Sequence, residues 1–416
     1  MTFTDSDDTY RSAADTPPPD FDTPEELLSL AREMIRIPSV TGSEAEVAVF
    51  ASDWMSEAGL DVETLEVEAD RPNVIATIGS GQGPLYVMNG HLDIVPVPED
   101  EEWEHPPFEA VVADGRLHGR GSFDMKGGCA SLMWAAARLA EQKDNLQGTL
   151  QVHLVCDEEK GGNAGSGAIA QAISEQRLPR PAGILSPELS WFHLRTAERG
   201  IFQFRLRFKG RSSHTARARA GGLNAIAVAS RGVLALEKHI DRFHPDVGFP
   251  VLSVNRIEAG RSNNQVPSTC TVLVDRRIVP GETAENVIEE VRSALDGLNE
   301  QTEDGRFLPV EYELITEADD LMAVVPANMT DREEPVVQAL WDEAESLLGY
   351  RPPLYTDWGG ATDAHWFRSM GIPMVTMGPT GAGAHAANEY TDVASLGAIG
   401  EIYRRTVARL LGVTDD

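Results

Sequence analysis

Residues 85–93 read LYVMNGHLD, an apolar run that ends in a histidine and an aspartate. Comparable apolar runs occupy residues 73–78 and 150–155, and stretches with helical character follow at 128–141 and 167–175. Alternation of strands and helices predicts an α/β domain with layers of helices around a largely buried sheet. Residues 85–93 therefore indicate a buried strand that is followed by a histidine and an aspartate, two chemically active side chains.

The pattern changes near residues 201–208, where apolar and polar residues alternate as in a sheet with one buried face. Helices are expected beyond it at 224–237 and 283–298. This order of strands and helices predicts a small α+β module, ferredoxin-like in its arrangement, inserted into the first domain. The expected parts are an acidic tail (1–22), the first part of the main domain (23–197), the module (198–314) and the second part of the main domain (315–416).

The charge of the chain excludes several kinds of partner. Its 416 residues include 35 Lys+Arg and 66 Asp+Glu, and the formal net charge is −31. Because the average field repels phosphate, neither nucleic acid nor a membrane is expected as a partner. No apolar run approaches the ~20 residues of a membrane-spanning helix, and the N-terminal residues lack the features of a signal peptide. A cytoplasmic location is expected.

The basic residues add a second indication. Only five of the 35 are lysines, and the others are arginines. An acid excess with scarce lysine is similar to the composition of proteins from salt-accumulating halophiles. In molar salt the Debye length is only ~3 Å, so self-repulsion between carboxylates costs little. The composition therefore predicts a halophilic protein.

Several separated segments carry side chains that can bind metals. His91 and Asp93 lie two positions apart, which places them on the same side of a strand. A carboxylate beside a metal-binding histidine commonly fixes its ring orientation. Asp124 stands in the glycine-rich segment 119–128, where glycines permit unusual backbone conformations. Both segments are candidate parts of one metal site.

Three further segments add carboxylates and a histidine. Asp157-Glu158-Glu159 follows a very apolar strand, where three acids repel one another unless cations neutralise them. Glu188 and His385, in the segment 383–389, are the remaining candidates. Each motif alone is weak, since a lone histidine is more often a core or surface residue. Their order after apolar strands makes the combination far more specific.

The combined motifs resemble the zinc-dependent aminoacylase, acetylornithine deacetylase, succinyl-diaminopimelate desuccinylase and glutamate carboxypeptidase family of co-catalytic metallohydrolases. The resemblance runs from Ile37-Pro38-Ser39-Val40 to 385–390 and includes 90–96, 119–128 and 157–159. It implies a mixed-sheet α/β catalytic domain of the di-zinc peptidase type. The inserted module would be the lid and dimerisation domain of a homodimer.

The resemblance also implies a ligand set for two Zn²⁺ or Co²⁺ ions per chain. Asp124 would bridge the two ions. His91 and Glu188 would complete the ligands of one ion, and Glu159 and His385 those of the other. The residue chemistry agrees, because a bridging carboxylate with nitrogen and oxygen ligands suits two zinc ions ~3.5–4 Å apart.

The remaining implied roles are catalytic and substrate-binding. Asp93 would orient the histidine beside it, and Glu158 would be the general base that later protonates the leaving amine. His214 would reach the neighbouring subunit's active site and help to stabilise the oxyanion. Asn264 and Arg277 would bind the substrate, the arginine by a bidentate pair with a carboxylate.

The sequence thus predicts a metal-dependent hydrolase that cleaves the amide bond of an N-acyl amino acid, of the acetylornithine deacetylase or succinyl-diaminopimelate desuccinylase type. The nearest alternative is a carboxypeptidase or dipeptidase on the same site, because residues 157–161 also resemble that branch. A non-catalytic metal-binding scaffold is permitted by the fold alone, although the intact Glu158 argues against it. The expected substrate is a small N-acyl amino acid or dipeptide with a carboxylate.

Overall fold

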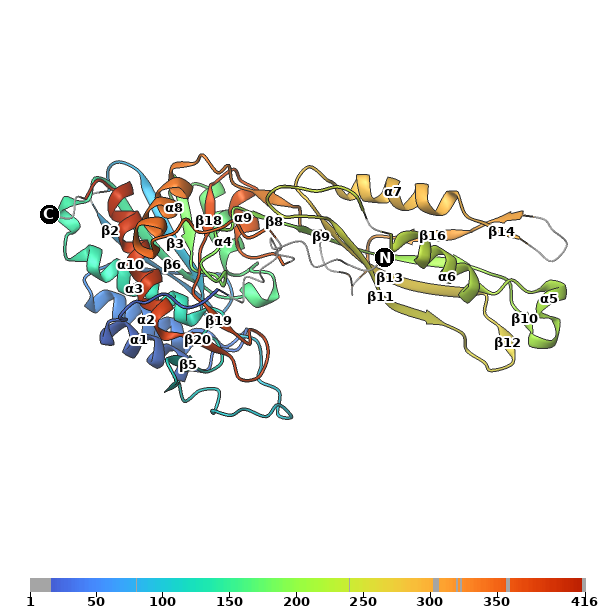
Figure 1. The fold of residues 1–416 in the computed structure, drawn as a ribbon, viewed down its shortest axis with the longest axis horizontal. Coiled ribbons are helices and arrows are strands. Elements are labelled where there is room, and N and C mark those ends of the chain that lie inside the picture. The colour runs from blue at the N-terminus through green and yellow to red at the C-terminus, as the bar shows by residue number, and fades with distance from the viewer. Residues whose placement is uncertain are drawn as a thin grey trace. The chain divides into compact units, whose positions relative to one another are not determined.

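The computed structural model describes residues 16–79, 81–238, 240–301, 307–318, 321, 324–356 and 360–413. The chain divides into two compact units, which Figure 1 shows as ribbons. Unit 1 comprises Met1–Thr196, Thr330–Tyr355 and Thr362–Asp416, and unit 2 comprises Ala197–Met329 and Thr356–Ala361. The first 15 residues of the predicted acidic tail lie outside the described residues.

Unit 1 contains a six-stranded mixed sheet in the order β1-β2-β6-β3-β7-β18. These strands are β1 (Asp61–Glu66), β2 (Pro72–Gly79), β3 (Leu85–His91), β6 (Thr149–Val155), β7 (Gly183–Ser186) and β18 (Met374–Thr376). The apolar run that begins at Leu85 forms β3, which is parallel to both of its neighbours, β6 and β7. Parallel strands end at the same edge of a sheet, so the segments that follow these three strands meet there.

Both faces of this sheet are buried, because side chains along each strand alternate between two cores. On β3, Tyr86 and Met88 join the larger core, whereas Leu85 and Val87 join the smaller one. Helices α1 (Glu25–Arg36), α2 (Ala45–Glu57), α3 (Lys126–Ala140), α8 (Pro335–Leu348) and α10 (Val393–Leu410) pack in the larger core, and α4 (Ser166–Ser174) and α9 (Ala364–Arg368) in the smaller. The predicted α/β class with a largely buried mixed sheet is confirmed.

A second sheet of unit 1 joins two segments that are distant in the sequence. Its order is β19-β20-β5-β4. The strands are β4 (Val111–Ala113), β5 (Arg116–His118), β19 (Gly381–Ala382) and β20 (Tyr390–Asp392). Because β5 pairs with β20, the glycine-rich segment after β5 lies beside the loop between β19 and β20. This pairing places two predicted ligand segments next to each other.

Unit 2 contains an antiparallel sheet in the order β11-β13-β9-β16. Its elements follow the chain as β9 (Gly200–Lys209), α6 (Ala225–Leu236), β11 (Val251–Ala259), β13 (Thr269–Ile278), α7 (Ala284–Asp296) and β16 (Tyr312–Ile315). Phe202, Phe204, Leu206 and Phe208 alternate along β9 and share a buried core with side chains from both helices. This is the ferredoxin-like arrangement expected of the inserted module.

The second unit continues beyond residue 314, which is the predicted end of the inserted module. Strand β17 (Asn328–Met329) pairs with β8 (Ala197–Glu198), and Val325 forms an isolated bridge with Ile201. The chain therefore leaves the unit beside the point where it entered. The short segment Thr356–Ala361 also belongs to unit 2. Pairing between segments so far apart in the sequence leaves no local pattern from which these boundaries could be predicted.

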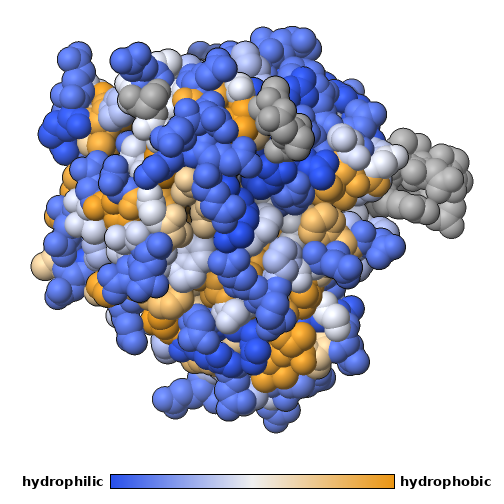
Figure 2. Space-filling model, turned by 90° about the vertical axis from the view of Figure 1, so that its left-hand side faces the viewer, coloured by the Kyte–Doolittle hydropathy of each residue, from blue (hydrophilic) through white to orange (hydrophobic). Residues whose placement is uncertain are grey.

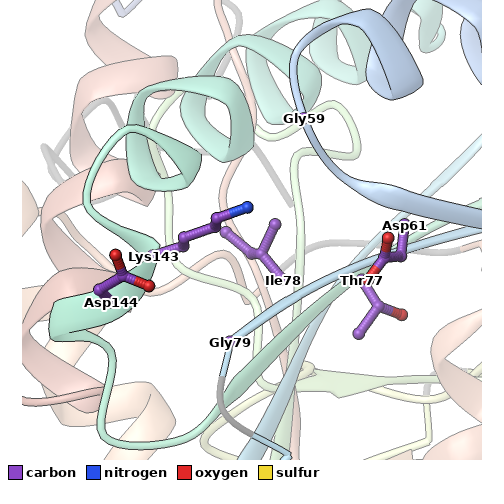
Figure 3. A pocket seen from close by; sticks show the side chains of 7 residues that line it. All are labelled: Gly59, Asp61, Thr77, Ile78, Gly79, Lys143 and Asp144. Carbon is purple, nitrogen blue, oxygen red and sulfur yellow. The ribbon is translucent and has the colours of Figure 1, made fainter.

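A small pocket lies at the opposite end of the main sheet from the edge where β3, β6 and β7 end (Figure 3). Its lining residues are Gly59, Asp61, Thr77, Ile78, Gly79, Lys143 and Asp144. Gly79 pairs with Thr149, the first residue of β6, which fixes this position. No residue of the predicted site lines this pocket.

The surface of unit 1 that Figure 2 shows is mostly hydrophilic, with small separate apolar areas. Among the described helices, none is both long and apolar enough to span a membrane.

Candidate metal centre

The carboxyl ends of the parallel strands bring the predicted ligands of unit 1 together. His91 is the last residue of β3, and the short 3-10 turn η3 (Glu158–Lys160) follows β6. Glu188 lies two residues after β7, and Asp124 lies two residues before α3. His385 belongs to the loop between β19 and β20. Residues from five separate segments therefore converge at one edge of the sheet.

The carboxylate of Asp124 is the centre of this arrangement. Its Oδ1 lies 3.2 Å from His91 Nε2, and its Oδ2 lies 3.2 Å from His385 Nε2. Glu159 Oε2 lies 2.9 Å from the same His385 nitrogen, and Glu188 Oε2 lies 3.6 Å from His91 Nε2. Each oxygen of Asp124 thus faces a different histidine, as a carboxylate shared by two metal ions requires.

These residues fit divalent metal ions. His91, Asp124 and Glu159 each offer a ligand atom, and these atoms lie within 4.8 Å of one another. Glu159 Oε1 is buried and has no hydrogen-bond partner among the described residues. Imidazole nitrogens and carboxylate oxygens are ordinary ligands of zinc and related ions. An unpaired buried oxygen is explained when such an ion occupies the site.

The electrostatics of the cluster also favour cations. Burial, together with the neighbouring Asp124, raises the pKa of Glu188 to about 8. Burial also opposes ionisation of Asp124, but its hydrogen bonds with His385 and His91 hold its pKa below the ordinary value. Hydrogen bonds to Asp124 and Glu159 raise the pKa of His385 to about 10. These shifts reflect crowded carboxylates that need nearby positive charge.

Asp93 acts on its neighbours through two different groups. Its carbonyl oxygen lies 2.9 Å from His91 Nδ1, whereas the nearest carboxylate oxygen is 3.6 Å from that nitrogen. The carboxylate instead accepts hydrogen bonds from Thr41 Oγ1 at 2.9 Å and from the backbone N–H groups of Glu158 and Glu159 at 3.1 and 3.2 Å. His91 is therefore oriented through a backbone carbonyl, which leaves Nε2 for the site, while the carboxylate holds η3.

Asp157 differs from the two acids that follow it. Arg71 Nη2 lies 2.8 Å from Asp157 Oδ1 and also 2.8 Å from Glu44 Oε1. The other oxygen of Asp157 accepts a hydrogen bond from the Ala164 N–H at 3.0 Å. The sequence predicts that all three acids of 157–159 need cations, but Asp157 already has a guanidinium partner. Arg71 lies 86 positions away, and no sequence motif marks it.

Glu389 is a second buried group that the sequence analysis leaves without a role. Its carboxylate accepts hydrogen bonds from the Arg120 side chain and from the backbone N–H groups of Gly121, Phe123 and Asp124. It lies four residues after His385, a predicted ligand, and this proximity is the signal that the sequence offers. The hydrogen-bond partners of Glu389 lie more than 260 positions away, and no sequence pattern connects them to it.

The other three predicted site residues belong to unit 2. His214 lies on β10 (Ser213–His214), which pairs with β12 (Gln265–Val266), and its ring is exposed. Asn264 directly precedes β12. Arg277 lies on β13, with its Nε 2.7 Å from Asp275 Oδ1. The structure thus brings His214 and Asn264 onto one short ribbon, which we call the β10–β12 ribbon, and places Arg277 on the sheet.

A mixed α/β sheet carries a cluster of acids and histidines at the carboxyl ends of its parallel strands, and this set of ligand atoms suits divalent metal ions. The chain belongs to peptidase family M20/M25/M40, whose model matches residues 87–409. The family resemblance seen in the sequence is thereby confirmed.

Similar proteins match over nearly their whole length. The succinyl-diaminopimelate desuccinylase of Marinobacter nauticus is 28% identical over 393 residues, which cover 92% of this chain and 98% of that protein. Aminopeptidase PepT from Bacillus cereus has a TM-score of 0.72 at 19% identity, covering 92% of this chain and 97% of its own. The YXEP protein of Bacillus subtilis, a dinuclear metal binding peptidase from the M20 family, has a TM-score of 0.67 at 20% identity, covering 93% and 98%. The two structures share the fold of this chain.

Proposed function

We propose that this hydrolase removes the acyl group from an N-acyl amino acid. The observation that carries the proposal is the carboxylate of Asp124 placed between His91 and His385, with Glu158 beside the first of these histidines. The full-length similarity to a desuccinylase supports this branch of the family. From the acid-rich, lysine-poor composition we also propose that the enzyme works in a salt-rich cytoplasm.

We propose two Zn²⁺ or Co²⁺ ions per chain. His91 and Glu188 would hold one ion, Glu159 and His385 the other, and Asp124 both. Bound ions of this kind polarise the substrate carbonyl and make a water molecule more acidic. The dinuclear centre of the Bacillus subtilis relative supports this number.

Glu158 performs the proton transfers in this scheme. Its Oε2 lies 3.9 Å from His91 Nε2, so the carboxylate faces the reacting region. Burial raises its pKa well above the ordinary value, against the opposing effect of His91. A raised pKa suits a group that takes a proton from water and then gives it to the leaving amine. The backbone N–H of Glu158 donates a hydrogen bond to the Asp93 carboxylate, which fixes the turn η3 that carries Glu158.

Unit 2 would supply substrate recognition in a homodimer. We propose that His214 stabilises the oxyanion in the partner subunit's site and that Asn264 and Arg277 bind the substrate. Arg277 already forms an ion pair with Asp275. A substrate carboxylate would therefore replace one carboxylate partner of this guanidinium by another.

Hydrolysis of dipeptides is the second candidate, because PepT and the YXEP protein, which share the fold, are peptidases. A screen in molar KCl with added Zn²⁺ or Co²⁺ separates the two. N-acetyl and N-succinyl amino acids are expected to be hydrolysed faster than dipeptides. Faster turnover of dipeptides would assign the peptidase activity instead, and no turnover of either by metal-loaded protein would refute the proposal.

A further inference from the structure

We propose that Glu389 is a positioning residue that builds the metal site of Asp124, Glu159 and His385. It would do so by joining the backbone that carries Asp124 to the loop that carries His385. The inference rests on the proposed two-metal function and goes beyond it, because Glu389 is not one of the proposed ligands.

The side chain of Glu389 is fully buried and saturated with hydrogen bonds. Its Oε2 accepts from Arg120 Nη1 at 2.7 Å and from the Gly121 N–H at 3.0 Å. Its Oε1 accepts from the N–H groups of Phe123 at 2.9 Å and Asp124 at 3.0 Å. The backbone adds a fifth contact, because the carbonyl of Glu389 accepts from the Gly119 N–H at 3.0 Å. The glycine-rich segment is thus wrapped around one carboxylate.

Only an ionised carboxylate satisfies all four side-chain contacts. A glutamine has a single acceptor oxygen, and its NH₂ group would face two N–H donors. The guanidinium of Arg120 is also buried, with 1% of its side chain exposed. Loss of the negative charge would leave this cation with only the more distant Glu101 carboxylate, 4.0 Å from its Nη2, as an ion-pair partner among the described residues.

The contacts of Glu389 concern mainly one of the two proposed metal sites, the one that contains His385. Glu389 lies four residues after His385, in the same connection between β19 and β20. Its hydrogen bond to the Asp124 N–H fixes the backbone of the bridging residue. By contrast, His91 ends the central strand β3, and Glu188 lies two residues after β7. The site with His385 should therefore depend on Glu389 more strongly than the site with His91.

The test is a metal titration of Glu389→Gln without substrate. Chelator-stripped protein is titrated with Co²⁺, with elemental analysis after dialysis for the number of ions and visible absorption for their environment. Wild type should bind two ions. The variant should bind the second ion about 10- to 100-fold more weakly, as when partners of metal ligands are removed, and the first ion with a smaller loss, because both ions share Asp124.

Glu282→Gln is the matched control. Glu282 is a buried carboxylate in unit 2 that accepts from Arg276 Nη2 at 3.0 Å and from the Val279 N–H at 2.9 Å. This variant should keep both ions at wild-type affinity even where its melting temperature falls. Should Glu389→Gln not fold, Glu389→Asp keeps the charge with a shorter reach and should also weaken the second ion more than the first.

The outcomes separate the two proposals. A folded Glu389 variant that binds both ions as wild type does, or that weakens both equally, overturns the positioning role. Wild-type protein that binds no ion refutes the metal centre itself, whatever the variants do.

Discussion

Neighbouring carboxylates at the site have different partners, and the partner decides what each of them can do. Asp157 is bound by Arg71 at 2.8 Å, so its charge is already compensated. Glu159 lies 2.9 Å from His385 and keeps one buried oxygen without a partner among the described residues. Glu158 is held by its backbone while its side chain faces His91. Three consecutive acids therefore have three separate tasks.

Replacement of Glu158 by glutamine tests its proposed role as the general base. The change keeps the size of the side chain and removes its ability to accept a proton. Both metals should remain bound, and kcat should fall by roughly 10²- to 10⁴-fold, the usual contribution of general acid–base catalysis. The measurement is kcat together with the metal content of the same preparation.

Glu159→Gln is the control for that variant, since it changes the adjacent residue in the same way. Glu159 is a proposed ligand, so this variant should lose metal as well as activity. Near-normal kcat in Glu158→Gln, or equal metal loss in both variants, would show that Glu158 is not the base.

A buried histidine in the sheet makes stability depend on pH. His153 on β6 is buried, its Nε2 lies 3.1 Å from Gln151 Oε1, and burial lowers its pKa to about 4. The unfolded chain therefore takes up this proton first as pH falls below ~6.5. The stability that this neutral imidazole contributes is fully present above pH ~6.5 and should be lost as the pH falls from there to about 4.

His153→Gln removes this titration. Unfolding in urea, with chelator present, should show a wild-type free energy that falls more steeply between pH 6.5 and 4 than that of the variant. The difference in slope should approach ~1.4 kcal/mol per pH unit, the value for one proton. Parallel pH profiles would contradict the assignment of a neutral buried imidazole.

At the scale of helices and strands, the elements with a clear periodic pattern of apolar residues could be predicted from the sequence. The alternation along β9 and the helices at α6 and α7 follow the expected ranges closely. By contrast, no helix is predicted at α10, which has glycines in its interior. A Cβ at Gly397 would lie 2.8 Å from the Thr23 Cα, and one at Gly400 would lie 3.1 Å from the Trp134 ring. Close packing, which the sequence pattern does not display, requires these glycines.

The same limit applies to the site. His91 ends a buried strand, and Glu159 and Glu188 follow two others, so their convergence could be predicted from the parallel sheet. Arg71 and Glu389 could not be assigned roles, because their partners are distant in the sequence and ordinary in composition. A motif identifies ligands, whereas the residues that hold them are recognised only in the folded chain.

The β10–β12 ribbon carries an element-scale prediction. Its His214 is exposed, with its Nδ1 accepting from the Ala216 N–H at 3.1 Å. If the ribbon serves the partner subunit, a mixture of inactive His214→Ala and inactive Glu158→Gln chains should regain part of the activity. Each mixed dimer would contain one site with both defects and one with neither. Absence of recovery after confirmed subunit exchange would contradict a role of His214 in the partner's site.

At the scale of the whole molecule, the net charge of −31 makes salt part of the expected stability. Self-repulsion of the folded chain is screened in molar KCl, where the Debye length is ~3 Å, and much less at 0.01 M, where it is ~30 Å. The melting temperature should therefore fall as KCl is diluted. Sucrose in place of KCl should not restore it fully, because sucrose carries no charge. A flat or inverse response to salt would reject the halophilic interpretation.

The metal requirement of hydrolysis tests the central claim most directly. Chelator-stripped protein is titrated with Zn²⁺ in molar KCl, and the hydrolysis of an N-succinyl amino acid is followed at each addition. The four proposed ligand side chains arranged around Asp124 predict that activity rises from near zero and reaches its maximum when two ions are bound per chain. Full activity in the stripped protein, with no metal detected, would contradict the account.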